Sequence, residues 1–193
     1  MSTSAANAPG HAVQTANWTR WGVAGAVAGI VASLVMAMYA MIAAATYQGV
    51  GFFTPLYHIA SSVISGEAMM ESMEAGMAGD NFVFIAGPAI VGALVHMMIG
   101  AGYGIVFAAF AKLVKLQGAA ILAAAGAVYG FLVFVVSSWV LLPLTASILG
   151  GGDPIRDMPT MVGYPTFIAE HILFGLVIGL LLIPVARKSL AHR

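Results

Sequence analysis

The feature that most constrains this chain is a series of four long apolar runs that hold almost no charge. They cover about residues 21–46, 82–111, 119–142 and 164–186. A helix needs about 20 apolar residues to cross the hydrocarbon core of a bilayer, and each run is long enough. Open strands are excluded because lipid cannot satisfy an unpaired backbone. The sequence therefore predicts an all-α integral membrane protein with four transmembrane helices.

The composition supports the same fold class. Only 7% of the 193 residues are charged and 61% are hydrophobic, whereas a soluble domain carries about 25% charged residues. A net charge of zero argues against nucleic acid as a partner, so the expected partners are the lipid bilayer and other membrane subunits. The chain has no cysteine, which excludes disulfides and thiolate metal sites.

The positions of the charges predict how the chain is oriented. The basic residues beside the ends of the apolar runs lie on one side: Arg20, Lys112, Lys115, Arg187, Lys188 and Arg193. The opposite side carries mostly carboxylates: Glu67, Glu71, Glu74, Asp80, Asp153 and Asp157. Because basic residues stay in the cytoplasm, we expect both termini inside. Residues 1–17 are expected to be a mobile tail and residues 18–193 a single domain.

The two connections on the outer side differ in pattern. Within the first, residues 47–81, a helical wheel of residues 66–77 places three glutamates opposite four methionines, Met69, Met70, Met73 and Met77. This pattern predicts a short amphipathic helix on the outer surface. The second connection, Gly150 to Pro165, is rich in glycine and proline, which predicts turns instead of helix.

The chain also looks internally duplicated. The segment Gly25–Gly29 of the first run matches Gly126–Gly130 of the third. A His-x-x-x-Gly-x-x-x-Gly pattern beginning at His96 in the second run recurs at His171 in the fourth. We therefore expect two similar helical hairpins in the same orientation, which makes a parallel repeat.

The two repeated histidines are the best candidates for a cofactor site. His96 and His171 have the same spacing to the basic residues that follow their runs, which predicts that they lie at one depth. Ionisable side chains inside a span usually face the bundle interior. With Gly100, Gly175 and Glu170 they form the predicted cofactor-binding set. Two imidazoles could ligate haem b, or could hydrogen-bond a quinone and relay protons.

A structural role explains the same pattern. Small residues at every fourth position let two helices approach closely, and a polar side chain can bridge them by a hydrogen bond. Duplication would copy such a packing device together with the rest of the hairpin. The sequence leaves both alternatives open.

Methionine and histidine on the outer side suggest a second kind of site. Met69, Met73 and Met77 follow one another at helical spacing, and His58 precedes them. Thioethers are soft ligands that select Cu(I), so these residues are the candidate metal ligands. Methionine is also a flexible apolar residue that suits an adaptable contact with lipid or a partner.

The histidine spans and the stretch Glu170–Gly175 resemble those of small bacterial inner-membrane proteins of the YagU-like type. The resemblance covers the four-helix plan and implies a bacterial inner membrane. It implies no chemistry, so no residue role is carried over from it.

No pattern typical of an enzyme is present. The chain lacks a phosphate-binding loop, a serine nucleophile elbow and a His/Glu zinc motif, and we assign no catalytic residue. The leading hypothesis is a small non-enzymatic membrane subunit of an electron-transfer complex that holds haem b or a quinone between His96 and His171. The alternatives are a copper-handling or small transport protein and a purely structural subunit.

Overall fold

The computed structural model describes residues 9–191, with side chains for residues 17–189, and all of its regular elements are helices. Four helical segments are long and apolar enough to cross a membrane: Asn17–Ala45, Ala86–Leu113, Ala119–Leu149 and Tyr164–Ser189. The prediction of an all-α protein with four spans is therefore confirmed, and the chain is a multi-pass membrane protein.

The spans are built from seven helical elements. They are α1 (Pro9–Ala45), α4 (Ala86–Leu113), α5 (Ala119–Val136), η1 (Ser137–Leu141), α6 (Leu142–Leu149), α9 (Tyr164–Leu181) and α10 (Ile183–Ala191). The connections contain α2 (Thr54–Ala60), α3 (Glu67–Met77), α7 (Gly152–Arg156) and α8 (Met158–Val162). Helix α1 begins at Pro9, so residues 9–17 of the expected tail are helical; residues 1–8 lie outside the described part.

Proline shapes the third span. The sequence predicts that this helix ends near Leu142, but it continues to Leu149 through the π-helical turn η1. Pro143 lacks an N–H and its ring crowds the carbonyl one turn earlier. The wider π turn before it accommodates the ring without ending the helix.

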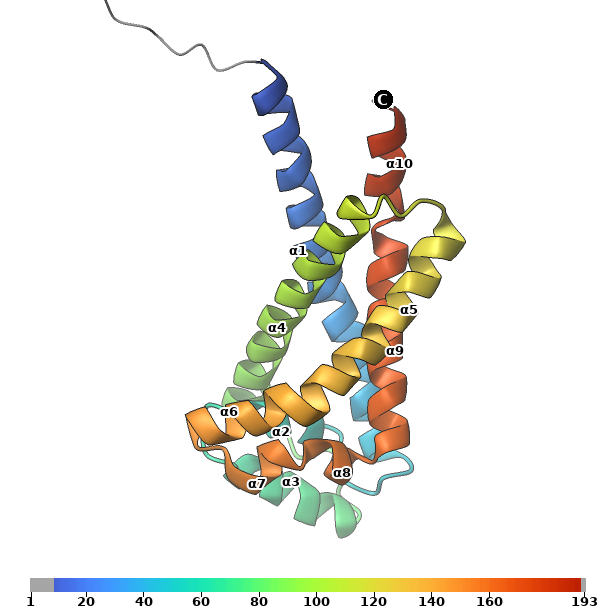
Figure 1. The fold of residues 1–193 in the computed structure, drawn as a ribbon. Coiled ribbons are helices and arrows are strands. Elements are labelled where there is room, and N and C mark those ends of the chain that lie inside the picture. Colours follow the sequence, from blue (N-terminus) through green and yellow to red (C-terminus); the bar gives the residue numbers. More distant parts are fainter. Residues whose placement is uncertain (1–8, 192–193) are drawn as a thin grey trace, which may run out of the picture.

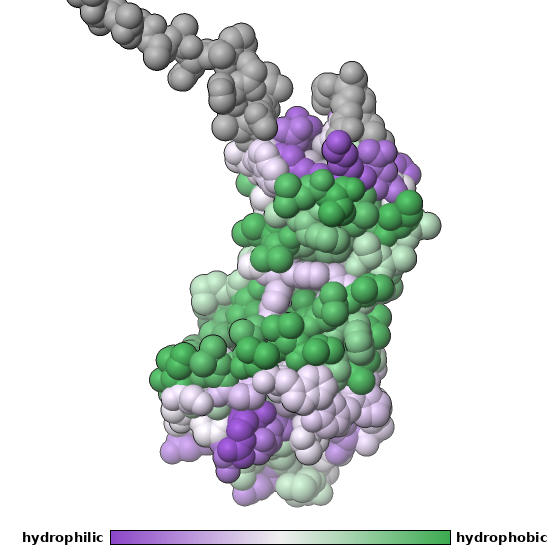
Figure 2. Space-filling view, in the orientation of Figure 1, coloured by the Kyte–Doolittle hydropathy of each residue, from purple (hydrophilic) through white to green (hydrophobic). Residues whose placement is uncertain are grey.

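The molecule has two distinct ends (Figure 1). The start of α1, the end of α10 and the α4–α5 connection lie at one end, which we name the terminal end. Helices α2, α3, α7 and α8 lie at the other, which we name the loop end. Hydrophobic residues form a belt between these ends, which are more polar (Figure 2).

The loop end confirms one local prediction and corrects another. Helix α3 forms at the expected place, and its three glutamates are exposed. Its Met69 is buried against α2 and α4 residues of the protein's own core instead of lipid. The second connection holds two short helices where turns were predicted, because Gly150 and Gly163 provide the positive φ angles that turn the chain before and after them.

Glycines bring the helices of each hairpin into contact. Helix α1 packs on α4 and helix α5 packs on α9. A Cβ added at Gly100 would lie 2.7 Å from the carbonyl oxygen of Gly29, and one at Gly130 would meet the carbonyl oxygen of His171. Such close approach is possible only where no side chain intervenes.

The two hairpins use the same glycine motif in different registers. Gly104 of α4 fits between Gly25 and Gly29 of α1. In the second hairpin it is Gly175 of α9 that fits between the matching glycines of α5, Gly126 and Gly130. The aligned sequence motifs pair Gly104 with Gly179 instead of Gly175, so the contacts of the second hairpin are displaced by one helical turn. Internal similarity of sequence is therefore not matched by identical packing.

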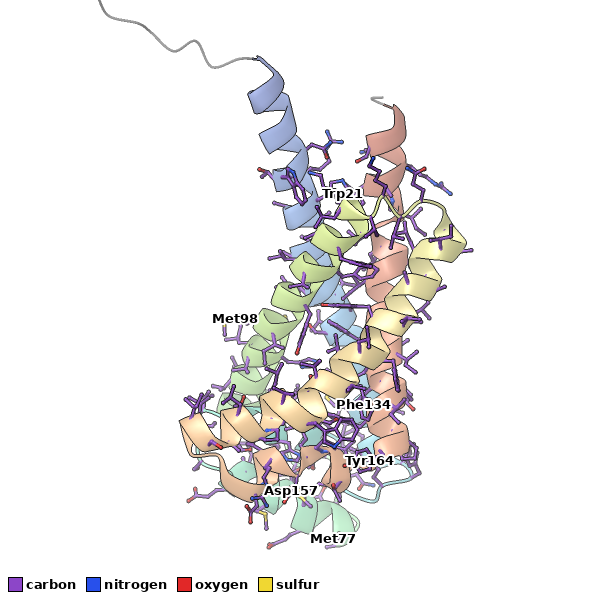
Figure 3. The ribbon with its side chains drawn as sticks, in the orientation of Figure 1. Trp21, Met77, Met98, Phe134, Asp157 and Tyr164 are labelled. Carbon is purple, nitrogen blue, oxygen red and sulfur yellow. The ribbon has the colours of Figure 1, made fainter. Side chains whose placement is uncertain are left out.

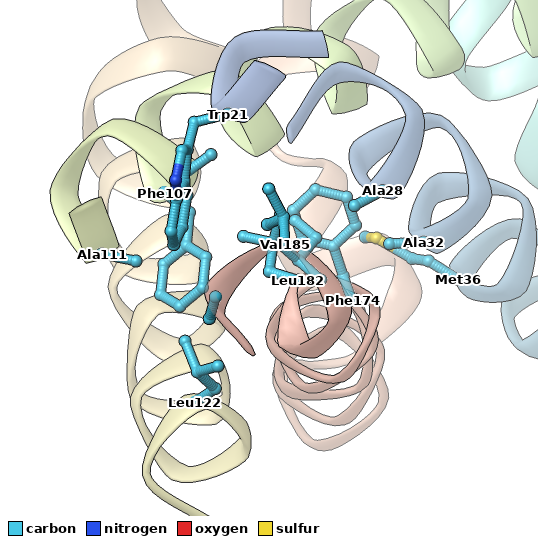
Figure 4. Packing of buried hydrophobic residues seen from close by; sticks show 13 residues of the cluster. Trp21, Ala28, Ala32, Met36, Phe107, Ala111, Leu122, Phe174, Leu182 and Val185 are labelled. Atoms are coloured by element: carbon cyan, nitrogen blue, oxygen red, sulfur yellow. The ribbon is translucent and has the colours of Figure 1, made fainter. Parts of the chain in front are cut away.

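A core at the terminal end joins the hairpins. Helix α1 lies between α4 and α9, and Trp21, Phe107, Phe174 and Leu182 form the centre of the buried cluster (Figure 4). The indole of Trp21 is buried and donates a hydrogen bond of 3.0 Å to Ser189 Oγ.

Candidate functional site

A cavity of about 330 Å³ lies in the half of the apolar belt nearer the loop end. All four spans line it, and α2, α7 and α8 cover it. Its lining is mostly apolar, with these polar side chains: Gln48, His58, Ser62, His96, Tyr103, Ser137, Thr145, Glu170 and His171. Both predicted histidines and the predicted glutamate thus meet at a single cavity, as ligand sites between packed helices commonly do.

His171 is oriented by the backbone of its own helix. Its Nδ1 lies 2.7 Å from the carbonyl oxygen of Phe167, one turn earlier in α9. Since only an N–H can bond a carbonyl, Nδ1 carries the proton of the neutral ring. Nε2 therefore holds a lone pair and is the nitrogen that can accept a bond from a ligand.

His96 reaches the cavity from α4. Its ring lies near the backbone of Ser33 on α1. Its Nε2 is buried and has no partner among the described residues. The Nε2 atoms of both rings are thus available to a ligand in the same space.

Glu170 is the least satisfied polar side chain of the site. Its carboxyl group is buried on α9, and Oε1 lies 3.9 Å from His171 Nδ1, which is too far for a hydrogen bond. Oε2 has no partner among the residues that the structure describes. A buried polar group without a partner is costly, so the carboxyl is available to a ligand or a water molecule.

Tyr103 and Ser137 complete the polar lining, and we did not identify them from the sequence. Their hydroxyl oxygens lie 3.3 Å apart and join α4 to the π turn. Tyr103 follows His96 by seven residues, which is the spacing of one helix face. From this spacing, the sequence could have identified Tyr103 as a residue on the same helix face as His96. Ser137 lines the cavity from the π turn, and such turns are frequent at functional sites.

The two predicted glycines differ in role. Gly100 lines the cavity and also lies against Gly29 and Ser33 of α1. Gly175 does not line the cavity, because the backbone of Gly126 and Gly130 occupies the space beside it. The space beside Gly175, a residue of the predicted cofactor-binding set, is therefore filled by helix packing.

The predicted metal ligands differ in their surroundings. His58 of α2 lines the cavity, and its Nε2 donates to the Pro154 carbonyl at 2.7 Å. Met69 is buried, whereas Met77 is 68% exposed near the end of the molecule (Figure 3). Among the described residues, no group of three or more His, Cys, Asp or Glu side chains could hold a metal ion.

The cover of the cavity, which we name the lid, consists of α2, α7 and α8. Three hydrogen bonds tie the two connections together across this region. His58 bonds Pro154 at 2.7 Å, Gln48 Nε2 donates to the Val162 carbonyl at 2.7 Å, and the hydroxyls of Tyr47 and Thr166 lie 2.9 Å apart. The lid therefore fastens one hairpin to the other at the loop end.

We expect acid to loosen this lid. Burial lowers the pKa of the His58 imidazole below its usual value of 6.5, because the interior disfavours its charged form. The open state then binds more protons than the closed state, so the closed lid is fully stable above about pH 6.5 and loses stability as the pH falls. The protection factors of the α2 and α7 amides, which are corrected for the intrinsic pH dependence of hydrogen exchange, should fall at acid pH.

A His58→Gln variant serves as the control for this expectation. Glutamine can still donate to the Pro154 carbonyl but does not titrate in this range. Its protection factors in α2 should be nearly independent of pH between 5 and 7. An equal fall of the protection factors in both proteins would show that another group controls the lid.

Comparison of this chain with protein-family models, with curated proteins and with solved structures finds no match.

Proposed function

We propose that this protein is a small non-enzymatic membrane subunit that binds a quinol or quinone in the cavity between His96 and His171. The observation that supports it most is the meeting of two imidazoles and a carboxyl group, contributed by both hairpins, in one mostly apolar cavity. A ligand of this class needs an apolar enclosure with a few hydrogen-bonding groups, which is the usual composition of such sites.

The protonation of His171 favours the reduced ligand. Its ring gives the Nδ1 proton to the Phe167 carbonyl, so its Nε2 accepts but does not donate, and His96 Nε2 at the same cavity has no partner among the described residues. The hydroxyl groups of a quinol are donors that match the acceptor of His171. An oxidised quinone offers only acceptors, and it would depend on donors such as Tyr103, Ser137 or a protonated Glu170.

Haem b is the second candidate. A histidine that ligates a metal almost always donates its other ring nitrogen to a carbonyl or carboxylate. His171 does so towards Phe167, and the available Nε2 atoms of His96 and His171 would be the ligands that hold the iron. Haem would supply one-electron transfer to a partner subunit. Its presence is decided by absorption spectra of the oxidised and reduced protein, where haem gives a Soret band and a sharp α band.

The charge distribution supports a location for this subunit. The terminal end carries Arg20, Lys112, Lys115, Arg187 and Lys188, so we place it in the cytoplasm. The resemblance of the histidine spans to YagU-like proteins favours a bacterial inner membrane. The cavity would then lie in the outer half of that membrane.

Substitution of His96 separates the two ligands. We expect His96→Ala to weaken binding of an alkyl benzoquinol, because one ligand hydroxyl loses its hydrogen-bond partner at a cost of about 1–3 kcal/mol, or roughly fivefold to 150-fold in Kd. His96→Gln keeps an amide oxygen as acceptor and should retain most of the quinol affinity. Calorimetric titration of the reconstituted protein measures both.

Met98→Ala is the matched control, because Met98 lies on the same helix but points outward and is 70% exposed (Figure 3). It should bind the quinol as the unaltered protein does. If the haem spectrum is present and is lost equally in His96→Ala and His96→Gln, haem is the ligand. If no variant changes quinol binding, or the unaltered protein binds none, the quinol proposal is wrong.

A further inference from the structure

The walls of the cavity are not equally closed. Helix α1 packs closely on α4 and α9, and α5 packs on α9, but α4 and α5 hardly touch. The third span runs obliquely across the bundle (Figure 1), and its elements α5, η1 and α6 make few contacts with α4. This weakly packed side lies at the depth of the cavity and would face lipid in the membrane.

The exposure of the lining residues locates an opening on this side. Among the described residues that line the cavity, only Ile99 and Leu141 are exposed, at 51% and 37%. Ile99 belongs to α4 and Leu141 to η1, and these two elements make few contacts with each other. A residue that both lines a cavity and is exposed stands at its mouth. Both side chains are apolar, as a surface inside the hydrocarbon belt requires.

The side that faces the loop end is closed. The lid residues that line the cavity include Leu56, His58, Ile155 and Met158, and all four are buried. The three hydrogen bonds between the connections hold this lid in place. A ligand coming from water would have to displace packed side chains and break these bonds, whereas one coming from lipid would not.

We propose that the ligand reaches the cavity sideways from the membrane, through a portal between Ile99 and Leu141. The inference rests on the proposed function and names the ligand class more closely. The ligand is a ring with hydroxyl groups that carries a long apolar chain. The ring lies beside His96, His171 and Glu170, and the chain extends through the portal into the leaflet nearer the loop end.

The chemistry of the cavity supports this division of the ligand. The unpartnered atoms, His96 Nε2 and Glu170 Oε2, require polar groups at the inner end. The rim offers only apolar side chains and leads to lipid. A long chain that stays in the hydrocarbon loses no favourable surroundings on binding, so only the ring has to be enclosed.

The test closes the portal with a crosslink. Because the chain has no cysteine, an Ile99→Cys/Leu141→Cys protein can be joined selectively by a cleavable bifunctional thiol reagent. We expect crosslinking in nanodiscs to slow uptake of a long-chain alkyl benzoquinol on the order of tenfold or more, as in other gated sites. Cleavage of the reagent should restore the rate. Stopped-flow measurement of the protein's tryptophan and tyrosine fluorescence, to which Tyr103 in the cavity wall contributes, follows binding.

The control pair is Met98→Cys/Val140→Cys, which lies next to the portal positions but does not line the cavity. Its crosslinking should leave the uptake rate unchanged. A second variant, Ile99→Trp, should weaken the long-chain quinol more than the same ring with a methyl group in place of the chain, because only the chain occupies the portal.

The outcomes separate this inference from the proposed function. Binding that is insensitive to the crosslink, with equal effects of Ile99→Trp on both ligands, would overturn the portal and leave the quinol site standing. Absence of binding of either ligand to the unaltered protein would overturn the proposed function itself, and the portal with it.

Discussion

Replacing Gly130 with leucine is expected to prevent the second hairpin from packing. A Cβ at this position would occupy the place of the His171 carbonyl oxygen and lie 3.1 Å from the backbone nitrogen of Gly175. Backbone atoms cannot move aside as a flexible side chain can, so α5 and α9 would have to separate. We expect a loss of about 3 kcal/mol or more in the free energy of unfolding, together with the loss of the His171 site.

Gly102→Leu provides a matched control, since no atom lies within 4 Å of a Cβ added there. Leucine favours helix over glycine at both positions by up to about 1 kcal/mol, so this variant should be as stable as the unaltered protein or slightly more stable. Chemical unfolding in detergent, followed by circular dichroism, measures the difference. Equal stabilities of the two variants would contradict the close helix crossing.

Replacing Glu170 with methionine is expected to stabilise the fold while it weakens ligand binding. The buried carboxyl oxygen Oε2 has no partner, and removing such a group abolishes its desolvation cost. Methionine has a similar length and adapts its shape to a core. We expect a gain of about 1–3 kcal/mol in the free energy of unfolding, with a loss of quinol affinity of roughly tenfold or more.

Glu74→Met separates burial from the chemical change itself. Glu74 is exposed on α3 at the loop end, so its substitution should change neither stability nor affinity. A Glu170→Met protein that is less stable than the unaltered one would mean that the carboxyl makes a bond in the folded protein. A gain in stability without loss of affinity would remove Glu170 from the proposed site.

Glu170 differs from the apolar side chains of the core because it has a buried carboxyl oxygen without a partner among the described residues. Buried ionisable groups in spans are rare and usually mark a pathway or a site. Here the carboxyl, the two imidazoles and the π turn at Ser137–Leu141 meet at one cavity. Helix packing alone requires none of the unpartnered atoms, so the structural alternative explains the glycines better than it explains the polar groups.

The amino-acid sequence by itself determined the spans, the number of connections and the amphipathic helix α3. These features depend on local properties: the length of an apolar run against the thickness of a bilayer, and the alternation of Glu and Met around one helix. The same reasoning selected His96, His171 and Glu170, because an ionisable group inside an apolar run stands out in any sequence.

Only the tertiary structure decided how these residues are arranged relative to one another. The one-turn difference in register between the hairpins, the bond from His58 to Pro154 and the portal at Ile99 and Leu141 all depend on how closely separate helices approach. That distance is set by contacts between residues far apart in the chain, such as Gly130 with His171. A local pattern of hydrophobicity contains no information about the distance between helices. The pattern determines which face of a helix is buried, but not which helix covers that face.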